Sequence, residues 1–191
     1  MGNNKKSKLT FLDPTSKITY EVDSNEEIQF FEWLIEAKTL GIVLDYKYQP
    51  ESFKLTDKMT YIPLFDNKKN KEKHLLAEHV YTADFKIVFD FKYGQKLSKK
   101  FKISKENLDQ NGNIIVYVDV KGGFMSNGSG RSFSINQKIV YMLHHIYINK
   151  VVPKEFFLDL GCPVKLFMTA KTNKPSKVFA GYPTIESIFN A

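Results

Sequence analysis

Two short motifs mark the centre of this chain: Tyr81-Thr82-Ala83-Asp84-Phe85 and Val118-Asp119-Val120-Lys121-Gly122-Gly123. Between these two motifs, apolar residues alternate with polar ones from Lys86 to Phe91 and again from Ile114 to Lys121. Alternation with a period of two is typical of half-buried strands. We therefore predict two strands here, with a carboxylate close to one end of each.

The two carboxylates could meet if the strands pair. Asp119 and Lys121 are two residues apart, so they project from the same face of their strand. Asp84 and Asp119 would then converge, with the amine of Lys121 beside them. Such a group could hold a hard cation and activate a water molecule. Asp and Lys also occur on the solvent face of ordinary strands, so the triplet alone is a weak signal.

Length and composition predict one domain with a basic surface. The chain has 191 residues, of which 42% are hydrophobic and 14% aromatic, enough for one substantial core. The net charge is +7, which suits a polyanionic partner such as nucleic acid. Arg131 is the only arginine. Lysine contacts phosphate as a point charge, so backbone contacts are expected rather than base contacts. An AT-rich genome, which favours lysine codons, would also explain the excess of lysine without any such contact.

Cysteine content and hydropathy predict a cytoplasmic protein without a membrane segment. The single cysteine, Cys162, excludes an internal disulfide and a cysteine-based zinc site. No apolar stretch approaches the roughly 18 residues of a membrane span. The start of the chain, residues 1–8, is polar and basic, which predicts local disorder and no signal peptide.

A first helix is predicted over residues 25–39. Ser24 is a good N-cap and Gly41 follows the predicted end. Apolar side chains recur along one face, and Glu27 lies at the head of that face. Glu27 has two interpretations: as a capping-box residue that bonds back to Ser24, or as an acid that points over the sheet toward Asp84 and Asp119.

A second helix is predicted over residues 133–148. Its apolar stripe is expected to comprise Ile135, Ile139, Met142, Leu143 and Ile146. Before it, residues 122–131 are rich in glycine and serine and predict a loop. That loop is either a plain connector or a segment that closes on a substrate.

The order of these motifs resembles the PD-(D/E)xK nuclease superfamily over about residues 20–148. Within it, the chain is similar to small phage endonucleases of the endonuclease I type of Holliday-junction resolvase. The features are the capped helix with Glu27, the Gln49-Pro50 pair, Asp84 after Ala83, and Asp119-Val120-Lys121. Ala83 stands where the name motif has proline. The distance from Asp84 to Asp119 is longer than in compact members, so residues near 92–113 would be an insertion.

The resemblance implies a role for each of these residues. Asp84, Asp119 and Glu27 would bind Mg²⁺, with Mn²⁺ as a substitute, and Lys121 would complete the catalytic set by orienting water or stabilising charge. The residues implied to contact nucleic acid are Gln49, Arg131, Gln137 and Lys138. Resolution of a junction would need two sites, which implies a homodimer.

We therefore expect an α/β protein in which a mixed central sheet is flanked by helices, with a restriction-endonuclease-like core. The predicted parts are an N-terminal arm (1–19), a nuclease core (20–150) and a C-terminal extension (151–191). The expected function is metal-dependent DNA endonuclease, phage-encoded and structure-selective, acting in recombination or replication. The alternative is a non-catalytic nucleic-acid-binding or virion-associated protein that retains the fold. A sequence-specific restriction enzyme is disfavoured by the single arginine.

Overall fold

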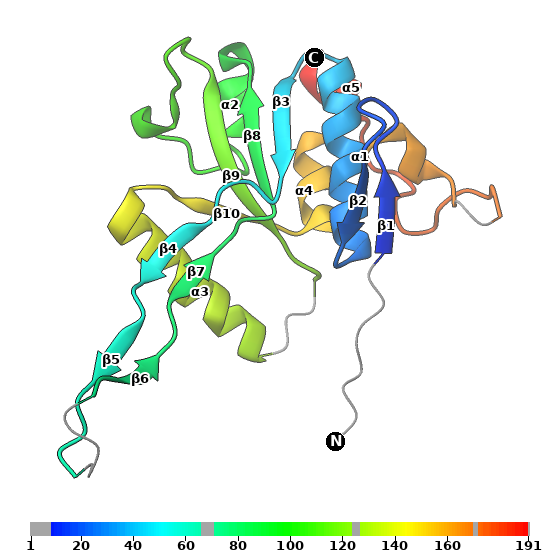
Figure 1. Ribbon diagram of the computed structural model, residues 1–191. Helices are drawn as coiled ribbons and strands as arrows, with labels where there is room; N and C mark the ends of the chain where they lie inside the picture. Colours follow the sequence, from blue (N-terminus) through cyan, green and yellow to red (C-terminus); the bar gives the residue numbers. More distant parts are fainter. Residues whose placement is uncertain (1–8, 66–70, 124–126, 170–171, 191) are drawn as a thin grey trace.

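The structure is a computed structural model that describes residues 9–65, 71–123, 127–169 and 172–190 (Figure 1). Residues 1–8, for which we predicted disorder, lie outside this description. The strands are β1 (Leu9–Leu12), β2 (Thr19–Val22), β3 (Val43–Tyr48), β4 (Phe53–Thr56), β5 (Met59–Tyr61), β6 (Lys73–Leu76), β7 (His79–Tyr81), β8 (Phe85–Phe89), β9 (Ile114–Val120) and β10 (Ile148–Val151). The helices are α1 (Asn25–Thr39), α2 (Gly94–Leu97), α3 (Asn127–His144), α4 (Pro153–Leu160) and α5 (Ile185–Phe189), with 3-10 turns η1 (Phe91–Tyr93), η2 (Lys105–Asn107) and η3 (Val164–Phe167).

A mixed sheet of four strands forms the centre, in the order β10-β9-β8-β3. β8 is antiparallel to both β9 and β3, whereas β10 runs parallel to β9. The prediction of a mixed central sheet with helices is therefore confirmed. In the β8–β9 register Phe85 lies opposite Val118, which brings Asp84 and Asp119 to the same end of the strand pair.

Each face of the sheet contributes to a different core, because successive side chains of a strand point to opposite faces. Val116, Val118 and Val120 of β9 belong to the larger core with α1 and α4. Tyr117, between them, belongs to a smaller core that includes Phe133 of α3. α1 and α3 thus cover opposite faces of the sheet.

Helix α1 forms where we predicted it, and its caps explain both ends. The Ser24 hydroxyl accepts a hydrogen bond from the backbone N–H of Glu27 at the N-terminus. Gly41 follows the C-cap with a φ of 72°, a conformation that disfavours residues with a side chain. The buried face of α1 carries Phe30, Phe31 and Trp33, which pack against Phe85 and Phe156.

The segments flanking the sheet pack into the larger core. Within residues 92–113, where we expected an insertion, Leu97 of α2 and Phe101 are buried in that core. The C-terminal residues do the same through Phe157 of α4 and Ile185 of α5. The indole N–H of Trp33 donates to the Leu160 carbonyl oxygen at 3.3 Å, which ties α1 to α4.

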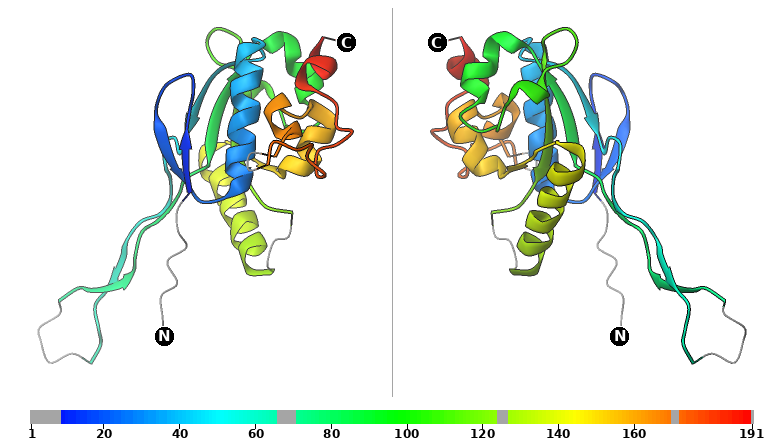
Figure 2. Two further views of the ribbon diagram at one scale, coloured as in Figure 1. Left: turned by 90° about the vertical axis from the view of Figure 1, so that its right-hand side faces the viewer. Right: turned by 90° about the vertical axis from the view of Figure 1, so that its left-hand side faces the viewer.

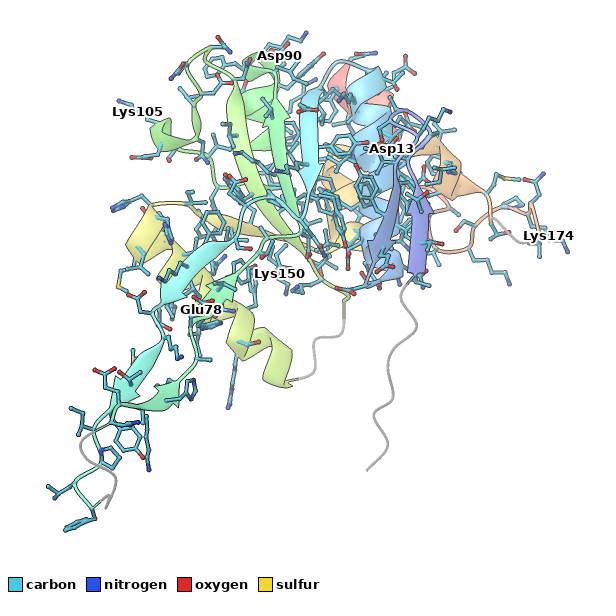
Figure 3. The ribbon with its side chains drawn as sticks, in the orientation of Figure 1. Asp13, Glu78, Asp90, Lys105, Lys150 and Lys174 are labelled. Carbon is cyan, nitrogen blue, oxygen red and sulfur yellow. The ribbon has the colours of Figure 1, made fainter. Side chains whose placement is uncertain are left out.

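The segment of the chain that connects β3 to β8 forms a two-stranded arm that projects from the body (Figures 1 and 2). β4 pairs with β7 at its base, and β5 pairs with β6 farther out, both antiparallel. Glu78, labelled in Figure 3, marks the connection between β6 and β7. This arm was not predicted, because the short strands on either side of residues 66–70 carry no buried stripe; Phe65 is 95% exposed.

Helix α3 differs from the prediction in its bounds and in its buried face. It starts at Asn127, inside the stretch expected to be a loop, and ends at His144. Ile135, Met142 and Leu143 are exposed, whereas Phe133 and Val140 are buried. The predicted apolar stripe is therefore wrong in part. Phe133 and Val140 pack instead into the smaller core that contains Tyr117.

Candidate active site

The side chains of Asp84 and Asp119 lie side by side. Asp84 directly precedes β8, and its Oδ2 accepts a hydrogen bond of 2.7 Å from the backbone N–H of Val120. That bond holds the Asp84 carboxyl against β9, next to Asp119. Burial, followed by the negative charge of Asp119 and a hydrogen bond to it, raises the pKa of Asp84 to about 8; the positive charge of Lys121 lowers it only in part. Two carboxyl groups this close repel when both are ionised, and a cation between them would relieve that repulsion.

Asp119 is buried, with 4% of its surface exposed, and both of its oxygens are engaged. Oδ1 accepts from the ammonium group of Lys121, and Oδ2 accepts from the hydroxyl of Tyr81. The Lys121 ammonium also lies 6.0 Å from the centre of the Phe133 ring on α3. The predicted same-face placement of Asp119 and Lys121 thus brings the two charges into contact.

Tyr81 is a member of this site for which we had predicted no role. It is the last residue of β7, at the base of the arm, and its ring is half-buried. Burial and the adjacent Asp119 raise the pKa of the Tyr81 hydroxyl, so the hydroxyl stays protonated and donates to the carboxylate. Tyr81 stands in the quoted motif, but only the position of the arm reveals its contact with Asp119.

Glu27 combines both of the interpretations that the sequence left open. Its carboxylate accepts from the Ser24 hydroxyl at 2.8 Å and from the backbone N–H of Asp23 at 3.3 Å, which satisfies the start of α1. The same carboxylate accepts from the Tyr48 hydroxyl at 2.7 Å. Glu27 is only 4% exposed, and its charge adds to the rise in the pKa of Asp84. It caps the helix and also contributes negative charge to the site.

The Asp84 and Asp119 carboxyl groups lie within hydrogen-bonding distance of each other. In the described parts of the chain, no three His, Cys, Asp or Glu side chains are arranged to hold a metal ion together. Mg²⁺ is commonly bound through one or two carboxylates, with waters and substrate phosphates completing its shell. The pair therefore fits such a cation, and Glu27 lies close enough for its charge to act on Asp84. We call Glu27, Asp84 and Asp119 the acidic cluster.

The residues that we predicted to contact nucleic acid fall into two groups. Gln49 lies beside the acidic cluster: its backbone N–H donates to the Asp84 carbonyl at 2.8 Å, and its side-chain amide donates to the Tyr48 hydroxyl at 3.3 Å. The others lie on α3, where Arg131 and Lys138 are exposed. The Gln137 amide donates to the Ile148 carbonyl at 2.6 Å, so it anchors β10.

Comparisons with protein-family models, with curated proteins and with solved structures each found no match for this chain. None of the helices in the described residues is both long enough and apolar enough to cross a membrane.

Proposed function

We propose that this protein is a metal-dependent DNA endonuclease with a restriction-endonuclease-like core. The observation that carries the proposal is the buried Asp84–Asp119 pair with Lys121 in contact with it. The net charge of +7 supports a polyanionic substrate. The helix that bears Glu27 and the mixed sheet that bears the two aspartates agree with the resemblance to the PD-(D/E)xK superfamily.

The residues of the site would divide the work of phosphodiester hydrolysis. Asp84 and Asp119 would hold Mg²⁺, or Mn²⁺ in its place. A bound divalent cation lowers the pKa of its water and neutralises charge that develops on the phosphate. Lys121 is fixed by Asp119, so its ammonium group would orient the attacking water or stabilise the phosphate. Tyr81 would keep the Asp119 carboxylate in a fixed orientation by its hydrogen bond.

On the resemblance alone, we also propose a phage-encoded enzyme that acts on branched DNA in the cytoplasm of a host cell. Hydrolysis of two strands of a junction would require two copies of the site, and hence a homodimer. The rival proposal, a non-catalytic nucleic-acid-binding protein, is disfavoured because a protein that only binds DNA would be free to lose the two carboxyl groups and Lys121.

The test is incubation of the purified protein with linear duplex, single-stranded and four-way-junction DNA, in Mg²⁺ or in excess EDTA. We expect cleavage in Mg²⁺ only, with the junction cut fastest, and no cleavage by Asp84→Asn in parallel reactions. DNA binding without cleavage of any substrate in either Mg²⁺ or Mn²⁺ would instead establish the non-catalytic alternative.

A further inference from the structure

A cavity lined by aromatic and basic side chains lies away from the acidic cluster. This cavity, of about 680 Å³, opens between α3 and the segment 98–107, and none of the acidic-cluster residues lines it. The η2 turn at one side of it carries Lys105, which is labelled in Figure 3. The backbone N–H of Lys102 donates to the side-chain oxygen of Asn149 at 2.8 Å, and this bond fixes the segment beside β10. The volume lies within the range of small-molecule sites, about 300–1,000 Å³.

The charged side chains that line the cavity are all basic. Lys102 and Lys138 face it from its two sides, and His145 joins them at the end of α3. In the part of the chain that the structure describes, neither lysine forms an ion pair, whereas Lys100 pairs with Asp159 and Lys86 with Glu51. Glu106 of η2 interacts electrostatically with His145 and accepts a hydrogen bond from the Ser104 hydroxyl, but it does not line the cavity. Two unpaired ammonium groups at one opening suit an anion such as a phosphate.

Aromatic rings line the cavity beside these basic side chains. Phe101, Tyr141 and Tyr147 line the cavity, and Tyr141 remains 54% exposed on the surface of α3. The ring of His145 lies against Tyr141 with 6.2 Å between ring centres and an angle of 74°. His145 has a φ of 55°, an uncommon conformation for a residue with a side chain, and its backbone N–H bonds to the Tyr141 carbonyl at 2.9 Å. An exposed aromatic ring beside cations is the arrangement that stacks a base and binds its phosphate.

We propose that this basic cavity binds a nucleotide, with the base against Tyr141 and the phosphate between Lys102 and Lys138. Helix α3 links the cavity to the acidic cluster, because the Lys121 ammonium, which is bonded to Asp119, lies 6.0 Å from the centre of the Phe133 ring on α3. Tyr141 lies about 12 Å farther along the helix at 1.5 Å per residue. That length corresponds to about three or four nucleotides of a DNA strand at its 3.4 Å spacing.

The ligand has two sources: a free nucleotide, or an unpaired nucleotide in a DNA strand. Binding of a nucleotide within a DNA strand rests on the proposed nuclease function, because the cavity would then hold the strand that extends from the acidic cluster. Nucleotide binding in the cavity does not itself require that function. The experiment therefore measures binding rather than cleavage, in EDTA, on the full chain.

The first arm uses a fluorescent single-stranded oligonucleotide and its anisotropy. We expect the Lys102→Ala, Lys138→Ala double variant to bind at least about tenfold more weakly. Tyr141→Ala should lose about 5- to 150-fold, the value of one stacked base. The matched control is the Lys154→Ala, Lys177→Ala double variant, which removes the same charge from exposed positions outside the cavity. Equal losses in the two double variants would overturn the proposal, since binding would then depend on net charge alone.

The second arm uses a deoxynucleoside monophosphate and a Tyr141→Trp reporter. The only native tryptophan, Trp33, is fully buried, so a quenched signal would come from position 141. Quenching by the monophosphate shows that a free nucleotide enters, and quenching by the oligonucleotide alone assigns the site to a strand. The absence of quenching by both would contradict the proposal. If the cavity variants lose binding but the parent cuts no DNA, the nucleotide site stands and the nuclease proposal fails.

Discussion

The acidic cluster and the basic cavity both carry charged side chains, but these charges are arranged in opposite ways. In the acidic cluster, Asp119 is buried and its oxygens are bonded to Lys121 and Tyr81. In the basic cavity, Lys102 and Lys138 are exposed and form no ion pair within the described residues. Fixed, desolvated charge suits chemistry that needs preorganised groups, whereas free exposed charge suits binding of a polyanion. Substitutions in the two regions should therefore have separable effects.

The largest expected effect is on cleavage in Asp119→Asn. The amide keeps the shape of the side chain but removes a charged ligand, so the cleavage rate should fall by about a thousandfold or more, equivalent to about 4 kcal/mol. DNA binding should be retained or strengthened, because one negative charge that faces phosphate is gone. Rates from a junction-cleavage assay and affinities in EDTA check this. Asp45→Asn, an exposed residue paired with Lys38, is the control. A parent-like rate in Asp119→Asn would remove Asp119 from the site.

A smaller effect separates the two roles of Glu27. Glu27→Gln keeps a side chain that can cap α1 but removes the charge near Asp84, so cleavage should fall by about a hundredfold. Ser24→Ala is the matched control, because it weakens the cap and leaves the Glu27 carboxylate in place. That variant should lose about 1 kcal/mol of unfolding free energy and keep its cleavage rate. Thermal melts and cleavage rates of both variants measure these effects. If Glu27→Gln cleaves DNA like the parent, Glu27 has a purely structural role.

The smallest expected effect is on stability and comes from the burial of Asp84, followed by its repulsion from Asp119. The folded pKa of Asp84, about 8, lies above the ordinary value of about 3.9 for aspartate. Folding therefore favours the protonated form of Asp84. The resulting contribution to the free energy of unfolding is fully present below about pH 4 and is lost as the pH rises through about 8. Asp84→Asn should stabilise the metal-free protein by about 1 kcal/mol at pH 8 and by less at pH 5. Melting curves in EDTA at both pH values measure this, and a variant less stable than the parent at pH 8 would contradict it.

Local patterns predicted α1 and the two central strands because each pattern is decided by near neighbours. Ser24 and Gly41 set the ends of α1, and the alternation in β8 and β9 fixes which residues point to which face. The pairing of Asp84 with Asp119 followed from those strands.

Long-range packing decided the features that the sequence did not predict. The buried face of α3 depends on contacts of Phe133 and Val140 with residues from the arm and the sheet, and the outer strands of the arm, β5 and β6, have no buried face. Tyr81 reaches Asp119 only because the base of the arm lies beside β9. The basic cavity joins residues far apart in the chain, such as Lys102 and Lys138. None of these contacts leaves a signal in a short window of sequence.

Whether Asp84 and Asp119 share a cation is tested most directly by Mn²⁺ binding, measured as the loss of the free-ion electron paramagnetic resonance signal. We predict that the parent protein binds Mn²⁺ and that Asp84→Asn and Asp119→Asn each bind it at least about tenfold more weakly. Asp45→Asn should bind it like the parent. Unchanged Mn²⁺ affinity in both site variants, or none in the parent, would contradict the claim that Asp84 and Asp119 share a catalytic cation.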